Sequence, residues 1–313
     1  MVELQPVDSV EVTLVVDNFV DILMAGAEGV RRFPLAYDWA DREQLVAEHG
    51  FSALVTVEAG GQRSSILYDG GLTPKGARPE PRCAAGCRHR APRDRDLARP
   101  RGPSRRARGA GRPLRARAAA ADHPLRSLAR SQGALPGGTE LRLPPPSMAD
   151  LEREGLSVVS ERGPTLLVDG RVLVSGEVAR VTEFETGFPI HLARTGEEWE
   201  PDPLILDDQN VIVDVAGKGL VVVSGCSHAG TVNVLRNAQR LTGRQPIAGF
   251  VGGLHLGGGI FEPIIEPTVH EIAALGVGRV VPGHCTGWKA AMLLARTMPE
   301  AFVQPSVGTV LRF

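Results

Sequence analysis

Three histidines of this chain follow hydrophobic runs that end in small residues. The three turns read GCSH, GGLH and PGHC, and they carry His228, His255 and His284. Loops that leave one edge of a sheet can converge on a point, and neutral imidazole is a favoured ligand of zinc and iron. The repeated pattern of strand, small residue and histidine therefore favours a shared metal site over three unrelated loop histidines. His49, His191 and His270 lack this pattern, and we expect them to be structural or surface residues.

The hydrophobic pattern around these turns predicts alternating strands and helices. Apolar and β-branched runs indicate strands, and apolar residues at helical spacing indicate helices. Strands followed by helices occur in both halves of the chain, which is typical of two sheets between helical layers. The expected strands are residues 10–16, 51–58, 65–68, 164–169, 171–175, 211–215, 219–224, 247–251, 279–281 and 308–311, and the expected helices are residues 41–49, 228–243, 266–275 and 287–295.

The charge of the chain is very unevenly distributed. Its 313 residues have a formal net charge of −1. Between Arg78 and Arg130, however, there are sixteen arginines and four acidic residues, which leaves the rest of the chain strongly acidic. This stretch holds four leucines but no valine, isoleucine or aromatic residue, so it cannot bury enough apolar surface to offset the entropy of ordering. We therefore expect a disrupted, disordered segment at about residues 77–134.

Four explanations of the arginine-rich segment are open. It could be a basic arm that binds nucleic acid, although it lacks aromatic side chains for base stacking. It could be a zinc knuckle built from Cys83, Cys87 and His89, but the spacing is poor and a fourth ligand is missing. It could be a plain linker. We favour a fourth explanation, a coding region read in a shifted frame, because the pattern changes abruptly and resumes at residues 135–138 (LPGG).

Several motifs outside this segment resemble one known family. They are LVVDN near the start, GFSALV and ILYDGG, LILDDQ at 204–209, GLVVVSGCSHAG at 219–230, GGLHL at 252–256 and PGHCTG at 282–287. Together they resemble a branch of the metallo-β-lactamase superfamily, the branch similar to 7,8-dihydropterin-6-methyl-4-(β-D-ribofuranosyl)-aminobenzene-5′-phosphate synthase. The resemblance covers roughly residues 9–75 and 135–313. It implies an α/β fold, the αββα sandwich, as a single domain over residues 1–313 that the segment 77–134 interrupts.

The resemblance also implies a metal site at the edges of the sheets. His228, His255 and His284 would be ligands of one or two divalent ions, zinc in the first place, with iron or manganese as alternatives. Asp69, Cys226 and Asp208 would lie behind them and orient a ligand or a bound water. The alternatives are that Asp69 only caps a strand and that Asp208 lies on a solvated turn. The sequence does not identify a catalytic residue.

The family's central signature, H-x-H-x-D-H, is missing from the chain. It should follow the Asp69 strand by some tens of residues, where the only histidines are His89 and His123. Without it, much of the usual ligand set is absent, so the metal site is expected to be incomplete.

The resemblance implies a metal-dependent hydrolase that acts on a small, phosphorylated, pterin- or aminobenzoate-like molecule through a metal-activated water, impaired in this chain. The alternative is a catalytically dead fold, or a protein that binds nucleic acid through the basic segment. A nuclease similar to ribonuclease Z is less favoured, because of the GCSHAG motif and the acidic remainder of the chain. The sequence has no apolar run near the ~20 residues of a membrane span and no recognisable secretion signal. We therefore expect a cytoplasmic protein with a small-molecule substrate and neither a membrane nor a nucleic-acid partner; its oligomeric state is open.

Overall fold

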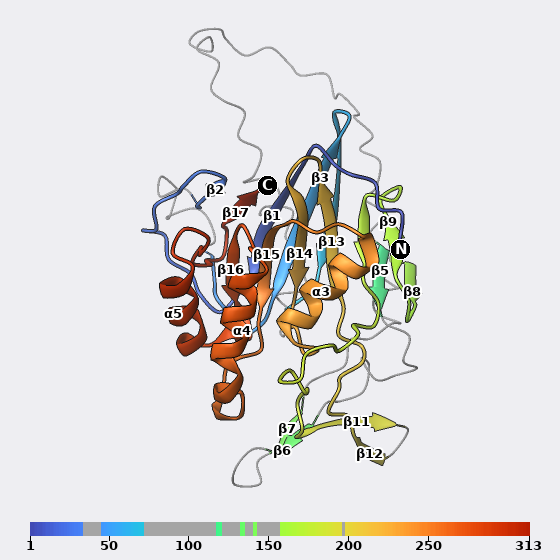
Figure 1. Ribbon diagram of the computed structural model, residues 1–313, viewed down its shortest axis with the longest axis vertical. Helices are drawn as coiled ribbons and strands as arrows, with labels where there is room; N and C mark the ends of the chain where they lie inside the picture. Colours follow the sequence, from blue (N-terminus) through green and yellow to red (C-terminus); the bar gives the residue numbers. More distant parts are fainter. Residues whose placement is uncertain (34–44, 72–116, 121–131, 135–139, 143–156, 196–197) are drawn as a thin grey trace, which may run out of the picture.

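The computed structural model describes residues 1–33, 45–71, 117–120, 132–134, 140–142, 157–195 and 198–313. Two sheets face each other at its centre (Figure 1). The first sheet has the strand order β2 (Val30–Arg31), β17 (Val310–Arg312), β1 (Ser9–Val16), β3 (Ser52–Ala59) and β4 (Gln62–Tyr68). The second has the order β16 (Val280–Gly283), β15 (Ile247–Gly253), β14 (Gly219–Ser224), β13 (Asn210–Val215), β10 (Val172–Val174) and β9 (Thr165–Leu167).

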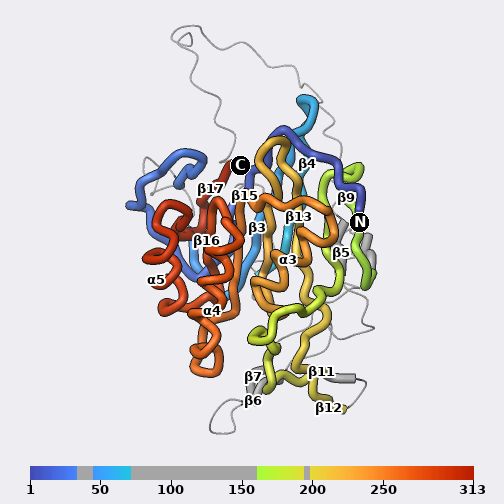
Figure 2. Tube along the Cα trace, in the orientation of Figure 1, coloured from blue at the N-terminus to red at the C-terminus, as the bar shows by residue number. Residues whose placement is uncertain are grey.

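The first sheet is antiparallel and joins the two ends of the chain. Buried and half-buried residues alternate along β1, as expected for a strand with one face on the core. Its Val12 pairs with Leu311 of β17 on one side and with Val55 of β3 on the other. The last strand of the chain therefore completes the sheet that the first strand begins, which Figure 2 shows as a red strand beside a blue one.

The second sheet is buried on both faces, which explains its continuous valine-rich runs. On β14, Val221 and Val223 pack into the core between the two sheets, whereas Leu220 and Val222 pack into a second core on the other side. The second core is covered by three helices, α3 (Thr231–Thr242), α4 (Glu262–Ala274) and α5 (Trp288–Thr297), which lie on one face of this sheet (Figure 1). The two facing sheets and this helical layer agree with the expected αββα sandwich.

The three helices follow the predicted ones closely. Helix α3 begins three residues later than predicted, because Gly230 just before it has a φ of 95°, which a helix cannot contain. It ends at Gly243, whose left-handed conformation is typical of a helix C-terminus. Helix α4 begins earlier than predicted, with a proline in its first turn. The helix expected at 41–49 is not formed at residues 45–49, and residues 41–44 lie outside the described part of the chain.

The structure also contains short strands that the sequence pattern did not predict. A four-stranded sheet has the order β12 (Glu198–Pro201), β11 (His191–Thr195), β6 (Gln132–Ala134) and β7 (Glu140–Arg142), and β5 (Arg117–Ala120) pairs with β8 (Ser157–Ser160). Strands β5 and β6 lie within the arginine-rich segment, where no regular structure was expected. The rest of that segment, including Cys83, Cys87, His89 and His123, lies outside the described residues. None of the described helices is long and apolar enough to cross a membrane.

Candidate functional site

The three predicted histidines lie just beyond the carboxyl ends of three neighbouring parallel strands. Strands β14, β15 and β16 run parallel, with Ser224 paired to Gly252 and Gly253 paired to Gly283. Helices α3 and α4 provide the crossovers between them. Because the carboxyl ends of parallel strands meet at one edge of a sheet, the three loops start side by side. The three histidines therefore lie on neighbouring loops at one edge of this sheet.

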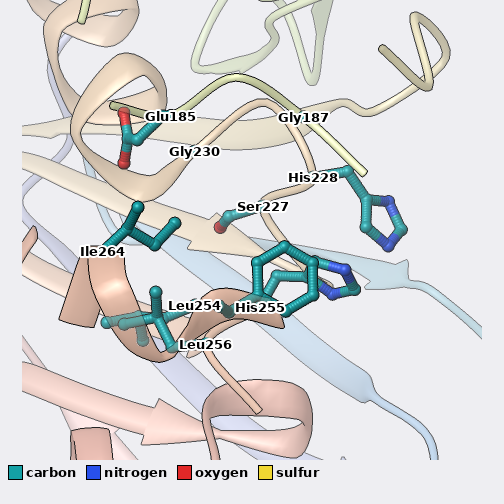
Figure 3. Close-up of a pocket in the computed structure, with 10 residues that line it drawn as sticks. Glu185, Gly187, Ser227, His228, Gly230, Leu254, His255, Leu256 and Ile264 are labelled. Carbon is teal, nitrogen blue, oxygen red and sulfur yellow. The ribbon is translucent and has the colours of Figure 1, made fainter. Parts of the chain in front are cut away.

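His228 and His255 lie against each other and against Cys226. Their ring centroids are 4.5 Å apart, and the Cys226 sulfur lies 3.1 Å from Nδ1 of His255. One potential ligand atom from each of these three residues lies within 4.8 Å of the others. Figure 3 shows the two imidazoles at one end of a pocket, with Glu185 at the other end.

His284 belongs to a second group, which also contains Cys226. The ligand atoms of Cys226, His284 and Cys285 lie within 4.8 Å of one another, and the two sulfurs are only 2.8 Å apart. The backbone N–H of His255 donates to the sulfur of Cys285 at 3.2 Å. Among the described residues, the three histidines form no such group by themselves, and Cys226 is the residue common to both groups.

Two residues from the opposite sheet hold the loop that carries His284. Asp17 and Asn18 follow strand β1. The backbone N–H of His284 donates to Asp17 Oδ1 at 2.6 Å, and the Asn18 side-chain amide donates to the carbonyl of His284 at 2.7 Å. The second carboxylate oxygen of Asp17 is buried and has no hydrogen-bond partner among the described residues. The site therefore depends on strand ends of both sheets.

Asp69 lies at the end of β4, beside the loop that carries Cys226. A Cβ atom at Gly225 would lie 2.8 Å from Oδ2 of Asp69, so only glycine allows the carboxylate to approach the backbone here. The other carboxylate oxygen accepts the backbone N–H of Gly70 at 2.6 Å. The neighbouring Tyr68 hydroxyl accepts the N–H of Gly225 and donates to the carbonyl of Gln209. Asp69 thus contacts the GCSH turn, but it makes no described hydrogen bond to a histidine.

Asp208 lies behind His228. It accepts the backbone N–H of Ala229 at 3.0 Å, and its Oδ1 lies 3.8 Å from Nδ1 of His228. Its side chain is 7% exposed, so the expectation of a solvated turn is wrong for Asp208. Burial raises the pKa of Asp208 to about 6, against the opposing effect of the backbone hydrogen bonds from Ala229 and His228 and of the charge of Arg180.

Burial keeps the three imidazoles neutral. It lowers the pKa of His228 to about 3, with the nearby His191 and His284 as further causes. It lowers the pKa of His284 to about 4 and also lowers the pKa of His255. Neutral imidazole is the form that binds metal ions, so all three histidines are ready to act as ligands near neutral pH.

The pKa values of the Cys226 and Cys285 thiols are shifted in opposite directions. Burial opposes ionisation of Cys285, but hydrogen bonds from Cys226 and His255 outweigh this effect and lower its pKa to about 6. The hydrogen bond to Cys285, together with burial, raises the pKa of Cys226 well above its ordinary value. The pair therefore resembles a thiol that donates to a thiolate, which concentrates negative charge between the three imidazoles.

The backbone around the site is strained. Seven non-glycine residues in the described part of the chain have a positive φ, and Asp69, Ser227, His255 and His284 are among them. Such conformations cost about 1–3 kcal/mol each and gather at functional sites, where the surrounding structure maintains them. Hydrogen bonds of the Ser227 hydroxyl to Ser224 and to the carbonyl of Gly253 hold one of these turns.

The donor set fits a metal ion of the zinc class. Three imidazoles and two sulfurs are ligands that zinc accepts, whereas magnesium and calcium prefer oxygen. Nε2 of His255 is buried without a hydrogen-bond partner among the described residues, as expected for a nitrogen that a cation would satisfy. The residues present therefore suit the metal that the resemblance implies.

Three residues at this site were not predicted. Cys285 directly follows His284 in PGHC, and this adjacency was a signal that could have identified it. Asp17 ends a strand-like run and carried no signal of its own. His49, which we expected to be structural or a surface residue, lies with its ring centroid 4.8 Å from that of His284. His191 instead contacts Asp202, in keeping with a structural role.

An apolar pocket adjoins His228 and His255. Leu254, Leu256, Phe261 and Ile264 line it. The rings of Phe188 and Phe261 pack edge-on against that of His255, with centroid distances of 5.2 and 4.6 Å. At its far end the carboxylate of Glu185 accepts the backbone N–H groups of Val232 and Asn233, which caps the N-terminus of α3.

Comparison with known proteins agrees with this architecture. No family model matches the chain. It is 31% identical over 169 residues to 7,8-dihydropterin-6-methyl-4-(β-D-ribofuranosyl)-aminobenzene-5′-phosphate synthase of Methanocaldococcus jannaschii, which covers 52% of this chain and 55% of the relative. It is 27% identical over 161 residues to an uncharacterised protein of the same organism, with 51% and 56% covered. The chain thus spans about half the length of the curated relatives it matches.

A solved structure is similar over almost the whole chain. It is described as a metal-dependent hydrolase of the β-lactamase superfamily. The superposition covers 97% of this chain and 98% of the solved chain, with a TM-score of 0.61 and a sequence identity of 19%. At this identity the likeness concerns the fold. The chain therefore has the metallo-β-lactamase fold, and part of its sequence is similar to the dihydropterin-ribofuranosyl-aminobenzene phosphate synthase.

Proposed function

We propose that the chain is a metal-dependent, hydrolase-like protein whose metal is held at the ends of β14, β15 and β16. The observation that carries this proposal is the cluster of neutral His228, His255 and His284 around Cys226. When bound, a divalent ion would supply Lewis acidity and lower the pKa of a water molecule towards neutrality. Zinc is the metal that this donor set favours, with iron as an alternative.

The surrounding residues have supporting roles in this proposal. In this proposal His228, His255 and His284 are ligands of one or two ions: His228 and His255 share a group with Cys226, and His284 lies in a second group with the same sulfur. Asp208 lies behind His228 and holds the backbone that follows it, so it sets the orientation of that ring. Asp69 maintains the GCSH turn from the other sheet. The side chains of Leu254, Leu256 and Phe261 beside His255 make one side of the site apolar.

We propose a small molecule of the pterin or aminobenzoate type, bearing a phosphate, as the substrate class. The support is the similarity to the M. jannaschii synthase, together with the phenylalanine rings beside His255. The missing H-x-H-x-D-H signature leads us to propose that activity is impaired relative to members that have it. We propose a single domain and a cytoplasmic location as well.

The second candidate is a protein without catalytic activity, either a dead fold or a nucleic-acid-binding protein. The sixteen arginines between Arg78 and Arg130 favour it. Binding to phosphates through such a segment would weaken steeply as salt concentration rises.

Metal analysis of the full-length chain tests the proposal. We expect stoichiometric bound metal and slow, metal-dependent hydrolysis of a phosphodiester such as bis(p-nitrophenyl) phosphate. Both should be lost in His284→Ala. The control is His270→Ala, because His270 is an exposed histidine on α4. Absence of bound metal, with salt-sensitive binding of RNA or DNA, would instead support the second candidate.

A further inference from the structure

The side chains of Cys226 and Cys285 approach each other across the end of strand β15. Cys226 follows β14 and Cys285 follows β16, while β15 separates these two strands. Their sulfurs are nevertheless 2.8 Å apart. Both residues are half-buried, so the pair is accessible from the site and shielded from bulk solvent.

Gly253 at the end of β15 makes this meeting possible. A Cβ atom there would lie 2.7 Å from the sulfur of Cys285, 3.2 Å from Cα of Cys226 and 2.5 Å from the carbonyl oxygen of Gly225. Any side chain at this position would therefore occupy the space where the two cysteine loops approach each other. The close approach of the two sulfurs therefore depends on the strand order and on Gly253.

His284 supplies a third donor next to the sulfurs. Its ligand atom and both sulfurs lie within 4.8 Å of one another. Nδ1 of His284 lies 3.5 Å from the Asn18 side-chain oxygen. Metal-binding histidines commonly direct their other ring nitrogen at such an oxygen, which fixes the orientation of the ring.

We propose that Cys226, Cys285 and His284 bind a thiophilic divalent ion of the zinc class through two thiolate sulfurs and one imidazole. This inference rests on the proposed function and adds two sulfur ligands to its metal site. Two cysteines and one histidine form a ligand set of catalytic zinc sites, in which a fourth position stays open. Thiolate ligands select zinc over magnesium, calcium and manganese. Cys226 and Cys285 are thus ligands in their own right and not only neighbours of the histidines.

Cobalt replacement in the full-length, reduced chain tests this site. Thiolate bound to cobalt gives an intense near-ultraviolet charge-transfer absorption, which nitrogen and oxygen ligands do not give. We expect the band in the wild type, a clear decrease in Cys285→Ser, and its loss in Cys226→Ser/Cys285→Ser. Zinc affinity, measured by competition with a chelator, should fall by about tenfold or more in the double variant. Cys83→Ser/Cys87→Ser is the matched control and should keep both the band and the affinity.

A second measurement avoids variants that fail to fold. X-ray absorption at the zinc edge of the wild-type chain should show sulfur neighbours at about 2.3 Å. A first coordination sphere of nitrogen and oxygen alone would overturn the inference, as would a band that survives in Cys226→Ser/Cys285→Ser. A disulfide that persists between the two residues in reductant would overturn it too. Sulfur-bound metal without hydrolysis would instead refute only the proposed function, and hydrolysis with sulfur-free metal would refute only the inference.

Discussion

Asp17 holds His284 across the two sheets: its Oδ1 accepts the backbone N–H of His284 at 2.6 Å, between residues 267 positions apart in the chain. The bond joins the end of the first strand to the loop after the last strand of the second sheet. Gly283 packs directly against the same carboxylate. A contact between the N-terminal and C-terminal parts therefore sets the position of one candidate ligand.

Replacement of Asp17 by alanine should weaken both the fold and the metal site. The buried N–H of His284 would lose its acceptor, which costs about 1–3 kcal/mol in the free energy of unfolding. Urea unfolding of the metal-free chain measures this loss, and chelator competition should show weaker zinc binding. Glu3→Ala, at an exposed carboxylate, is the control and should leave both unchanged. Unchanged zinc affinity in a destabilised Asp17→Ala would show that Asp17 supports the fold alone.

Gly253→Ala should separate the two cysteine loops. The added methyl group would meet the Gly225 carbonyl oxygen at 2.5 Å and the Cys285 sulfur at 2.7 Å, so the backbone must shift. Overpacking of this kind costs about 1–3 kcal/mol. Thermal unfolding measures the cost, and the cobalt band reports the sulfur pair. Gly259→Ala is the matched control, since none of the described residues comes within 4 Å of the position that its added methyl group would take. Equal effects of the two substitutions would contradict the role assigned to Gly253.

The central sheets could be predicted from the sequence because their residues carry a local pattern. Strand β14 reads GLVVVS, with both faces buried, and the turns GCSH, GGLH and PGHC mark its exit and those of two further strands. The four-stranded sheet that contains β12 was not predicted, because strands such as β12 (EWEP) are polar and mostly exposed. Contacts at the site between residues far apart in the chain could not be predicted for another reason. Cys226 and Cys285 are 59 positions apart, and Asp17 and His284 are 267 apart, so only the strand order brings them together.

Acid should destabilise the metal-free chain partly through His228. Its pKa in the fold is about 3, against an ordinary value of 6.5, chiefly because of burial. Between these values the unfolded chain binds a proton that the folded chain does not, so stability falls as pH decreases, by up to about 1.4 kcal/mol per pH unit for one group. Asp208 acts in the opposite direction, because its folded pKa is raised to about 6. His228→Asn removes the first contribution only. Urea unfolding between pH 7 and 4 should therefore show a smaller loss of stability on acidification in His228→Asn than in the wild type or in His270→Ala.

Zinc should stabilise the fold in proportion to its binding. A ligand that binds only the folded state adds about 2.7 kcal/mol at a concentration one hundred times its Kd. We expect the Tm of the metal-free chain to rise with added zinc and to return when a chelator is added. His255→Ala should show a smaller rise, because Nε2 of His255 is buried and has no hydrogen-bond partner in the described part of the chain. Magnesium at the same concentration should have little effect. An equal rise with magnesium would argue against nitrogen and sulfur ligands.

The nucleotide sequence across residues 77–134 should contain the missing ligands in another frame. The segment begins and ends abruptly, and the structure on either side of it supplies strands and candidate ligands of the metallo-β-lactamase fold. One alternative frame should encode H-x-H-x-D-H. If it does, a chain with the restored frame should bind zinc more tightly than the present one, because more ligands complete the metal's coordination. If neither alternative frame encodes the signature, the segment is genuine. Its arginines should then bind DNA or RNA with an affinity that decreases as salt concentration rises.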